Sequence, residues 1–457
     1  MSCNWPRVQI SEVCELIVDC VNKTAPRVDY ETPFKMIRTP NVKGGKISLN
    51  DCRFVEEDTY EKWTRRAKVL RDDVLLTREA PMGEVGIVDF DETVFLGQRI
   101  MQYRADRSKL DPHFLLYSFL SSDLQHQFNM HEGSGSVVSH IRVPDCSKFE
   151  LNLPPLDVQK DIAGVLKKLD RKISVNQQTN QTLEQMAQAI FKSWFVDFDP
   201  VKAKMNGEQP EGMDAATASL FPEKLVESEL GLIPEGWSIS ELGEYLDVLE
   251  TGKRPKGGVK GITEGIPSVG AENILGVGKY EFGKEKFIPE ELFNSLKKGV
   301  IESEDVLIYK DGGKPGDFKP RFSMFGYGFP YQKFAINEHV FRIRSNKLGQ
   351  SYLYCQMCDG YVYNDLRNKG AKAAIPGINQ KDVNSLRIVV PDEQILAKFN
   401  ESVRRFFEMI LKNSLQSQEL AKLRDTLLPK LLSGEIELGA TEAMEPSLVS
   451  SPIEQYL

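Results

Sequence analysis

Long hydrophobic runs, targeting patterns and paired cysteines are all scarce in this sequence of 457 residues. No stretch approaches the roughly 18 apolar residues that a membrane-spanning helix needs, so the sequence predicts no such helix. The first residues, Met1 to Arg7, lack the apolar core of a secretory signal peptide. The seven cysteines form an odd, scattered set, which favours reduced thiols over a disulfide framework. Together these absences predict a cytoplasmic protein.

Motifs for catalysis and metal binding are also missing. The sequence holds no G-x-x-x-x-G-K-[ST] phosphate loop, no G-x-S-x-G nucleophile elbow, and no Asn-Pro-Pro-Tyr or Asp-Pro-Pro-Tyr tetrapeptide of the amino-methyltransferase type. The five histidines show no metal-ligand spacing. Cys355 and Cys358 form a lone Cys-x-x-Cys in an apolar helical stretch, which favours a structural role over a metal or redox site. We therefore expect a chain that is not an enzyme.

The strongly basic composition that accompanies general nucleic-acid binding is absent as well. The chain has 58 Lys and Arg against 66 Asp and Glu, a formal charge of −8. This charge is unevenly placed. Residues 237–391 hold 22 basic and 19 acidic side chains, a net of +3, whereas residues 1–153 hold 20 and 23, a net of −3. A DNA-binding face would therefore be a local patch on a nearly neutral body.

What the sequence does contain is a long internal repeat. Short motifs recur about 232 to 237 residues apart, a spacing far above the roughly 20 to 50 residues of a solenoid repeat. Such a repeat predicts a duplicated domain. The positions that match at this spacing are Trp5 with Trp237, Asn41 with Asn273, Asp73-Val74-Leu75-Leu76 with Asp305-Val306-Leu307-Ile308, Gly133 with Gly370, and Pro154 with Pro391. Arg104 has a counterpart in Arg344, 240 residues further along the chain.

The pattern along the chain predicts an α+β fold of two duplicated α/β domains, each followed by a long helix. For example, residues 73–77 and 85–88 are expected to be buried strands, and Pro112 to Phe128 a helix. Pro429 is expected to kink or end the second long helix one turn early. The predicted blocks are a first α/β domain (1–153), a first long helix (154–198), a proline-containing connector (199–236), a second α/β domain (237–391), a second long helix (392–436) and a loose C-terminal tail (437–457).

Both long helices carry apolar residues at alternating steps of three and four, the heptad pattern of a coiled coil. In an antiparallel pairing with Asn176 opposite Asn413, almost every other layer is apolar; Ile173, which would face Gln416, does not fit. The alternative is that each helix packs only on its own domain. Further facing pairs in this register are Leu166 with Leu423 and Trp194 with Ile395. The expected core of the pair is Ile162, Leu166, Leu169, Asn176, Leu183, Ile190, Phe399, Phe406, Asn413, Leu420, Leu423 and Leu427.

Basic residues beside glycines recur in loops of both predicted domains. Glycine lets the backbone approach a phosphate closely, and Lys or Arg supplies the opposite charge. For any single loop, the alternative is an ordinary solvated surface. The recurrence in a duplicated domain favours DNA contact, and the candidate residues are Lys43, Lys46, Lys253, Arg254, Lys256, Lys314 and Lys372.

Several segments resemble the specificity subunits of type I restriction-modification systems, and the resemblance covers nearly the whole chain. It departs from the family at Trp5, which lacks a preceding Pro-x-Gly, and at Gly97-Gln98, where the second copy has Asn337-Glu338. The segments that carry it are Leu153 to Gln159 and Leu183 to Phe198 around the first long helix, Val390 to Gln394 and Leu427 to Ile436 around the second, and Ile233 to Trp237 before the second domain.

This resemblance implies two target recognition domains that each read one half of a split double-stranded DNA site, with the helix pair as a ruler for the spacer. It also implies docking of two modification (methyltransferase) subunits, which use S-adenosylmethionine, and of restriction (motor-nuclease) subunits. S-adenosylmethionine, ATP and Mg are expected on those partners, and this chain is expected to bind no cofactor and no metal. The alternative from another class is a non-catalytic coiled-coil scaffold that binds only proteins.

Overall fold

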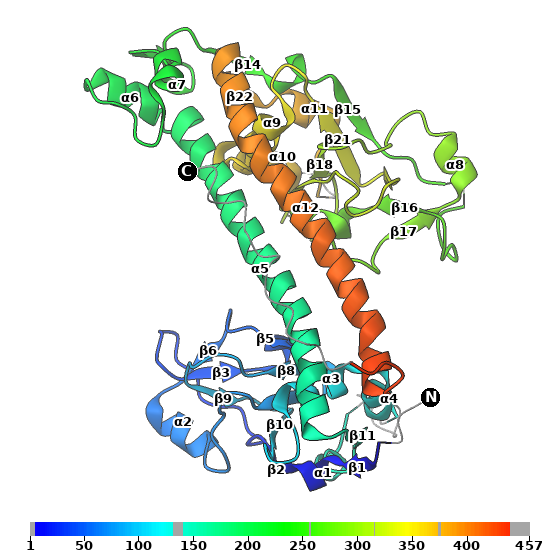
Figure 1. Ribbon diagram of the computed structural model, residues 1–457. Coiled ribbons are helices and arrows are strands. Elements are labelled where there is room, and N and C mark those ends of the chain that lie inside the picture. Colours follow the sequence, from blue (N-terminus) through cyan, green and yellow to red (C-terminus); the bar gives the residue numbers. More distant parts are fainter. Residues whose placement is uncertain (1–4, 131–139, 256, 315, 373–375, 439–457) are drawn as a thin grey trace. The chain divides into compact units, whose positions relative to one another are not determined.

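The computed structural model describes residues 5–130, 140–255, 257–314, 316–372 and 376–438 (Figure 1). The chain forms two compact units: unit 1 comprises Met1–Arg171 and Leu420–Leu457, and unit 2 comprises Lys172–Glu419. The long helices are α5 (Leu156–Phe195) and α12 (Glu393–Leu432), each of 40 residues. Each unit therefore combines one of the duplicated domains with a part of both long helices. This division differs from the sequence blocks, in which the helices stand apart from the domains.

Unit 1 is built on an antiparallel sheet with the strand order β2-β10-β7-β8. Strand β7 (Val74–Arg78) is buried on both faces. Because side chains alternate along a strand, Val74 and Leu76 pack in the cluster of α3 and α4, whereas Leu75 packs with strands of a second, smaller sheet. The other strands of the main sheet are β2 (Cys14–Asp19), β10 (Ile100–Ala105) and β8 (Met82–Ile87).

The smaller elements of unit 1 complete this arrangement. The predicted helix at Pro112 to Phe128 is two helices, α3 (Pro112–Leu120) and α4 (Ser122–Asn129), because the Ser121 side chain caps α4 by accepting from the amide of Leu124. The second sheet has the order β6-β3-β9. Its strands and the remaining elements are β6 (Arg53–Phe54), β3 (Lys35–Ile37), β9 (Val94–Leu96), β1 (Arg7–Gln9), α1 (Ile10–Val13), η1 (Thr39–Asn41), β4 (Val42–Lys43), β5 (Lys46–Ile47), α2 (Glu57–Trp63), η2 (Val143–Asp145) and β11 (Glu150–Asn152).

Unit 2 repeats this topology, which confirms the predicted duplication. Its main sheet has the order β15-β21-β18-β19, and its second sheet has the order β17-β16-β20, with one parallel pair in each second sheet. The elements are β14 (Ser238–Glu241), η3 (Leu242–Glu244), β15 (Val248–Thr251), β16 (Ile266–Val269), η4 (Ala271–Asn273), β17 (Lys286–Ile288), α8 (Glu290–Asn294), β18 (Val306–Tyr309), β19 (Phe322–Met324), β20 (Ala335–Ile336), β21 (Val340–Arg344), α9 (Gln350–Cys358), α10 (Gly360–Ala371), α11 (Gln380–Asn384) and β22 (Arg387–Val390).

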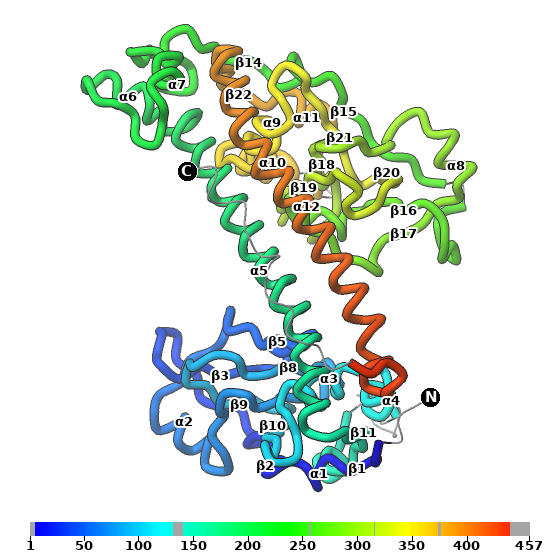
Figure 2. The backbone as a smooth tube through the Cα atoms, in the orientation of Figure 1, coloured from blue at the N-terminus to red at the C-terminus, as the bar shows by residue number. Residues whose placement is uncertain are grey.

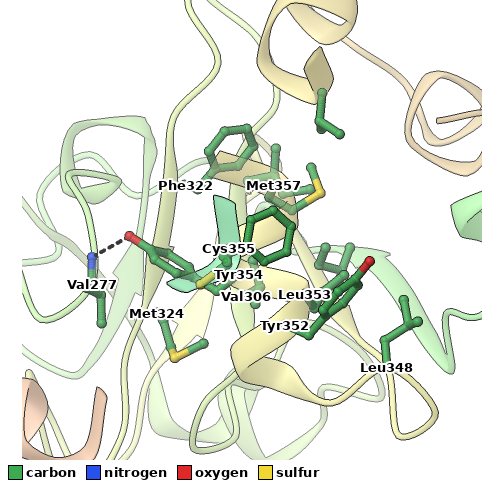
Figure 3. Close-up of a cluster of buried hydrophobic side chains, with 14 of the residues drawn as sticks. Val277, Val306, Phe322, Met324, Leu348, Tyr352, Leu353, Tyr354, Cys355 and Met357 are labelled. Carbon is green, nitrogen blue, oxygen red and sulfur yellow. Dashed lines mark hydrogen bonds between the residues drawn. The ribbon is translucent and has the colours of Figure 1, made fainter. Parts of the chain in front are cut away.

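The core of unit 2 accounts for the Cys-x-x-Cys motif. Helix α9 is buried along most of its length, and Cys355 lies in a cluster of apolar side chains from α9, β18 and β19 (Figure 3). The hydroxyl of Tyr354 accepts a hydrogen bond from the amide of Val277 at 3.0 Å. Burial raises the pKa of the Cys358 thiol to about 12. Cys355 thus behaves as a small core side chain, and Cys358 packs half-buried against the same cluster.

The two long helices pack antiparallel within each unit, as Figure 2 shows for the parts 172–195 and 393–419 of unit 2. The register differs from the predicted one by about one helical turn. Asn413 donates its side-chain amide to Oδ1 of Asn180 at 2.9 Å. The ring of Trp194 contacts Phe399, with centroids 5.9 Å apart, rather than Ile395. Because two asparagines lie four residues apart on α5, the sequence pattern alone selected the wrong one.

Two further expectations for the helices are wrong. Leu423, predicted in the helix-pair core, is 47% exposed; the neighbouring Arg424 is the residue that faces α5, where its guanidinium lies 2.7 Å from Asp170. Pro429 does not end α12, which continues to Leu432. The proline costs the helix a single amide donor, whereas Leu428, Leu431 and Leu432 are buried in the core of unit 1.

Burial of the other predicted helix-pair residues varies. Ile162, Leu166, Asn176 and Phe399 are buried, whereas Leu169, Leu183, Ile190, Phe406, Asn413, Leu420 and Leu427 are half-buried.

The connector between the duplicated domains contains only short elements, in keeping with its prolines. These are α6 (Asp199–Met205), α7 (Ala215–Leu220), β12 (Leu225–Ser228) and β13 (Gly231–Pro234). None of the helices in the described ranges is both long enough and apolar enough to span a bilayer. The six cysteines that the structure describes are all free thiols. Residues 439–457 of the predicted tail lie outside the described residues.

Candidate nucleic-acid interface

In each unit, a buried aspartate forms an ion pair with an arginine of the main sheet. We call this pair the brace. In unit 1, Nε of Arg104 donates to Oδ1 of Asp73 at 2.8 Å. In unit 2, Nε of Arg344 donates to Oδ1 of Asp305 at 2.7 Å. A second guanidinium nitrogen donates in each case to a main-chain carbonyl, that of Lys68 at 3.0 Å in unit 1 and that of Ser303 at 2.7 Å in unit 2. The predicted match of Arg104 with Arg344 is therefore confirmed, and this brace is common to both units.

The electrostatics of the brace differ between the units. Asp305 is fully buried and accepts from a second guanidinium, that of Arg342. Asp73 instead accepts from the neutral amide of Gln102 at 2.7 Å. Burial raises the pKa of Asp305, while the hydrogen bond from Arg342 opposes that rise. In unit 1, the hydrogen bond to Asp73 raises the pKa of Arg104. Both networks stiffen the sheet that carries the loops described next.

The loops on one side of each sheet are held by a repeated asparagine turn. Oδ1 of Asn41 accepts from the amide of Arg38 at 2.9 Å, and Oδ1 of Asn273 accepts from the amide of Gly270 at 3.3 Å. These turns follow β3 and β16. We call the surrounding region the loop edge: the ends of β2, β3 and β7 with the start of β10 in unit 1, and the ends of β15, β16 and β18 with the start of β21 in unit 2. The topology makes the two loop edges equivalent.

The loop edge of unit 1 contains a basic pocket of about 260 Å³. Four cationic side chains line it, together with the amide of Gln98, and none of the four was among the sequence candidates. These cations are Lys23, Arg38, Arg53 and Arg99. The internal repeat contained a signal that could have located this pocket. Counted on from the paired strands, the candidates at 253–254 match residues 21–22, which are next to Lys23.

Lys43 and Lys46 are exposed but do not line this pocket. They face each other across the short β4–β5 hairpin, whose turn residues Gly44 and Gly45 have φ values of +56° and +86°. Glycine adopts this left-handed conformation without steric cost. The amide of Gly44 donates to Glu84 of β8 at 3.1 Å, which fastens the hairpin to the edge strand of the sheet. The prediction for these two lysines rested on composition, and the fold directs them to another part of unit 1.

Lys253 and Arg254 are exposed at the loop edge of unit 2. Nε of Arg254 lies 3.6 Å from Oε1 of Glu338, which precedes β21. Lys314 and Lys372 are also exposed. Lys256 lies outside the described residues.

Main-chain hydrogen bonds join the segments that carry Lys314 and Lys372. The amide of Gly312 donates to the carbonyl of Pro376 at 2.9 Å, and that of Gly377 donates to Gly370 at 3.0 Å. A Cβ on Gly370 would lie 2.3 Å from the ring of Phe318, so this close packing requires glycine. The predicted counterpart of Gly370, Gly133, lies outside the described residues. The two lysines thus belong to one joined set of loops in unit 2.

A metal or cofactor site is not evident from the donor groups. Within the part of the chain that the structure describes, no three His, Cys, Asp or Glu side chains come together in a way that could hold a metal ion. The two loop edges instead present guanidinium, ammonium, imidazole and amide groups. Such groups can donate to phosphate oxygens and to base edges.

Comparisons with known proteins show a similarity to one family. Residues 3–185 match the model of the type I restriction modification DNA specificity domain. The specificity subunit of the type I restriction enzyme HindI from Haemophilus influenzae is 26% identical, over 80% of this chain and 87% of that protein. The chain is thus similar, over most of its length, to specificity subunits of type I restriction enzymes. These matches agree with the resemblance seen in the sequence motifs.

Further matches agree with this similarity. The type I restriction enzyme MjaIX specificity subunit from Methanocaldococcus jannaschii is 25% identical, over 80% of this chain and 78% of that protein. The crystal structure of a type I restriction-modification S subunit from M. genitalium aligns with a TM-score of 0.54 at 16% identity, covering 94% of this chain and 96% of that one. This structural likeness shows a shared fold.

Proposed function

We propose that this chain is a specificity subunit that reads a bipartite DNA target, with the loop edge of unit 1 on one half-site and the loop edge of unit 2 on the other. The match to the DNA specificity domain supports DNA target recognition. One observation carries the bipartite proposal: the same sheet, brace and asparagine turn recur in both units, while the side chains at the loop edges differ. Two copies of one scaffold with different surfaces suit two different half-sites.

The chain itself supplies binding and no chemistry in this proposal. Two modification subunits would methylate adenine with S-adenosylmethionine, and restriction subunits would use ATP and Mg to translocate and cleave DNA. The chain would bind none of these cofactors and would act in the cytoplasm. The names of its relatives as subunits of restriction enzymes support this assignment. So does the absence of catalytic motifs from the sequence.

The helix pair would act as the ruler that sets the length of the unspecified spacer. A ruler needs a fixed register, and polar layers supply one because sliding would leave their donors unpaired. In unit 2, the side-chain amide of Asn176 donates to Gln416 at 2.9 Å and to Ser417 at 3.3 Å. Asn180 donates to Ser414 at 3.1 Å. These bonds favour one register of α5 on α12.

Footprinting tests the proposal against a protein-binding scaffold. The full chain is combined with its modification subunits, and protection of a DNA library and the pattern of adenine methylation are measured. Two protected blocks with a constant gap, both methylated, are expected. A scaffold that binds only proteins would give no bipartite protection.

Charge reversal at the loop edge of unit 2 sharpens this test. The variant Lys253→Glu with Arg254→Glu should weaken DNA binding strongly. The matched control is Lys202→Glu with Lys224→Glu, at two exposed lysines of the connector that lie outside both loop edges. Equal losses for the two variants would show that general charge, rather than the loop edge, governs binding.

A further inference from the structure

One pair of a basic side chain and a carboxylate recurs at the same position of both loop edges with different chemistry. In unit 1, Nε of Arg99 lies 3.3 Å from Glu79; in unit 2, Nδ1 of His339 lies 2.5 Å from Asp311. In each unit the basic residue directly precedes an inner strand of the main sheet, and the strand registers place the two carboxylates at matching positions. Side-chain exposure also matches, at 48% and 46% for Arg99 and His339 and 26% and 27% for the carboxylates. The pair has kept its position and changed its residues.

One main-chain hydrogen bond is common to both positions. The amide of Arg78 donates to the carbonyl of Arg99 at 2.8 Å, and the amide of Lys310 donates to the carbonyl of His339 at 2.9 Å. Arg99 has a φ of +72°, in the left-handed region that a non-glycine residue rarely adopts. Strained residues of this kind are retained where the surroundings fix them, often at binding sites. The backbone therefore presents the side chain of Arg99 in one direction.

A second contact pair lies beside the first and is repeated in the same way. In unit 1, Nε2 of Gln98 donates to Oδ1 of Asn22 at 3.5 Å. In unit 2, Nε of Arg254 lies 3.6 Å from Oε1 of Glu338. Asn22 and Arg254 each lie three residues beyond the last paired residue of β2 and β15. Gln98 and Glu338 each lie two residues before the start of β10 and β21. A neutral amide pair in one copy has become an ion pair in the other.

The buried braces differ from the loop-edge pairs in what the duplication has kept. Asp73 with Arg104 and Asp305 with Arg344 keep both residue types, as a stabilising pair would. The loop-edge pairs keep only their geometry. A contact needed solely for stability gives no reason for this exchange, whereas reading two different half-sites requires it.

We propose that these two pairs are base-reading elements, and that Arg99 contacts a guanine in the first half-site while Arg254 contacts a guanine in the second. Arginine donates two parallel hydrogen bonds to O6 and N7 of guanine, an arrangement that no other base offers in the major groove. Glu79 and Glu338 would act as positioning residues that orient the guanidinium groups. This inference rests on the proposed function and adds the reading residues and one base for each half-site.

The neighbouring cations have a different task in this proposal. Lys23, Arg38 and Arg53 line the same pocket as Arg99. Arg38 donates to the main-chain carbonyl of Asp51 at 2.9 Å, and among the described residues no carboxylate pairs with any of the three cations. They would contact phosphate oxygens, which positions the domain on the duplex and carries no sequence information.

The experiment compares methylated sequences for the full chain, its modification subunits and a random DNA library. Arg99→Gln should relax or replace one guanine of the first half-site, with a roughly tenfold to hundredfold loss on the original target. The second half-site should stay unchanged. Arg254→Gln should give the reverse result, so each variant is the control for the other. Arg65→Gln, at an exposed arginine after α2, should change neither half-site.

Each outcome decides the proposal. If the wild-type complex marks a bipartite target but both variants select the same bases as the wild type, the reading residues are wrong while the proposed function stands. An equal loss on all sequences would assign both arginines to phosphate contacts and would also overturn the inference. Arg99→Lys guards against misfolding, since it keeps the charge, loses the paired donors and should still relax the guanine. If the wild-type complex marks no bipartite target, the proposed function itself fails.

Discussion

The side-chain amide of Asn413 donates to Oδ1 of Asn180 across 2.9 Å, within the helix pair of unit 2. Asn176, one turn away, instead donates to the main-chain carbonyl of Asn413 at 3.3 Å. The two asparagines of α5 therefore depend on Asn413 in different ways. A leucine at position 413 would remove the first bond and leave the second carbonyl in place.

This difference predicts the outcome of two double-mutant cycles. Asn413→Leu should destabilise the protein, because the half-buried oxygen of Asn180 loses its donor. Adding Asn180→Leu should recover part of the loss, with a coupling energy of about 1 kcal/mol. Asn176→Leu combined with Asn413→Leu should be nearly additive. Urea unfolding measures both cycles, and equal coupling in the two would contradict this register.

The buried braces predict unequal costs for one chemical change. Asp305→Asn leaves the guanidinium groups of Arg342 and Arg344 without their central carboxylate, and should lower the unfolding free energy by about 3 to 5 kcal/mol. Asp73→Asn should cost less, because Arg104 is its single cationic partner. Thermal unfolding of the two variants tests this order. A larger loss for Asp73→Asn would show that the neutral contact with Gln102 matters more than charge pairing.

Cysteine labelling tests the structural role of the Cys-x-x-Cys motif. Burial raises the pKa of Cys358 to about 12 and also raises that of Cys355. Since only the thiolate reacts readily, iodoacetamide at pH 8 should label neither residue in the folded chain within the time that labels both in urea. Mass spectrometry locates the label. Rapid labelling of Cys355 in the folded protein would contradict its place in the core.

Salt dependence separates phosphate contacts in the two parts of unit 1. Lys23→Ala and Arg53→Ala should each reduce the slope of log K against log salt by about 0.9, the value for one phosphate contact. Lys43→Ala, in the hairpin on β8, should leave the slope unchanged. DNA-binding titrations at four salt concentrations give the slopes. A reduced slope for Lys43→Ala alone would favour the original sequence candidates over the basic pocket.

Helix insertions test the ruler. Adding four residues to each of α5 and α12, in segments on the same side of the asparagine layer, should lengthen the spacer and leave both half-sites unchanged. Methylome sequencing reads the result. New half-sites with the old spacer would show that the helices influence recognition rather than distance.

Local sequence predicted the elements well where a single physical property decides them. Residues 73–77 and 85–88 fall largely within β7 and β8 because buried strands require continuous apolar runs. The matches of Asn41 with Asn273 and of Arg104 with Arg344 identified side chains with the same bonds in each unit. A buried carboxylate or amide has few ways to be satisfied, so duplication leaves it unchanged.

Candidate DNA-contacting surface residues were predicted less well. A basic residue next to a glycine in the sequence does not reveal which side chains lie near it in the folded chain. Lys43 and Lys46 have the expected composition but lie on the β4–β5 hairpin beside β8, whereas Arg99 and Arg38 meet only through strands that are distant in the sequence. The register of the two helices was also beyond the heptad pattern. Asn176 and Asn180 both lie on the seam of α5, and only contacts in the folded chain decide which of them bonds to the side chain of Asn413.

The sequence by itself determined the family resemblance, the duplication and the pairing of two long helices, because these follow from periodicity and repeated motifs along the chain. Only the tertiary structure decided which cations gather at the loop edges and which asparagines share a hydrogen bond. Those outcomes depend on distances between side chains from separate strands and helices, and packing sets such distances to within a few ångströms.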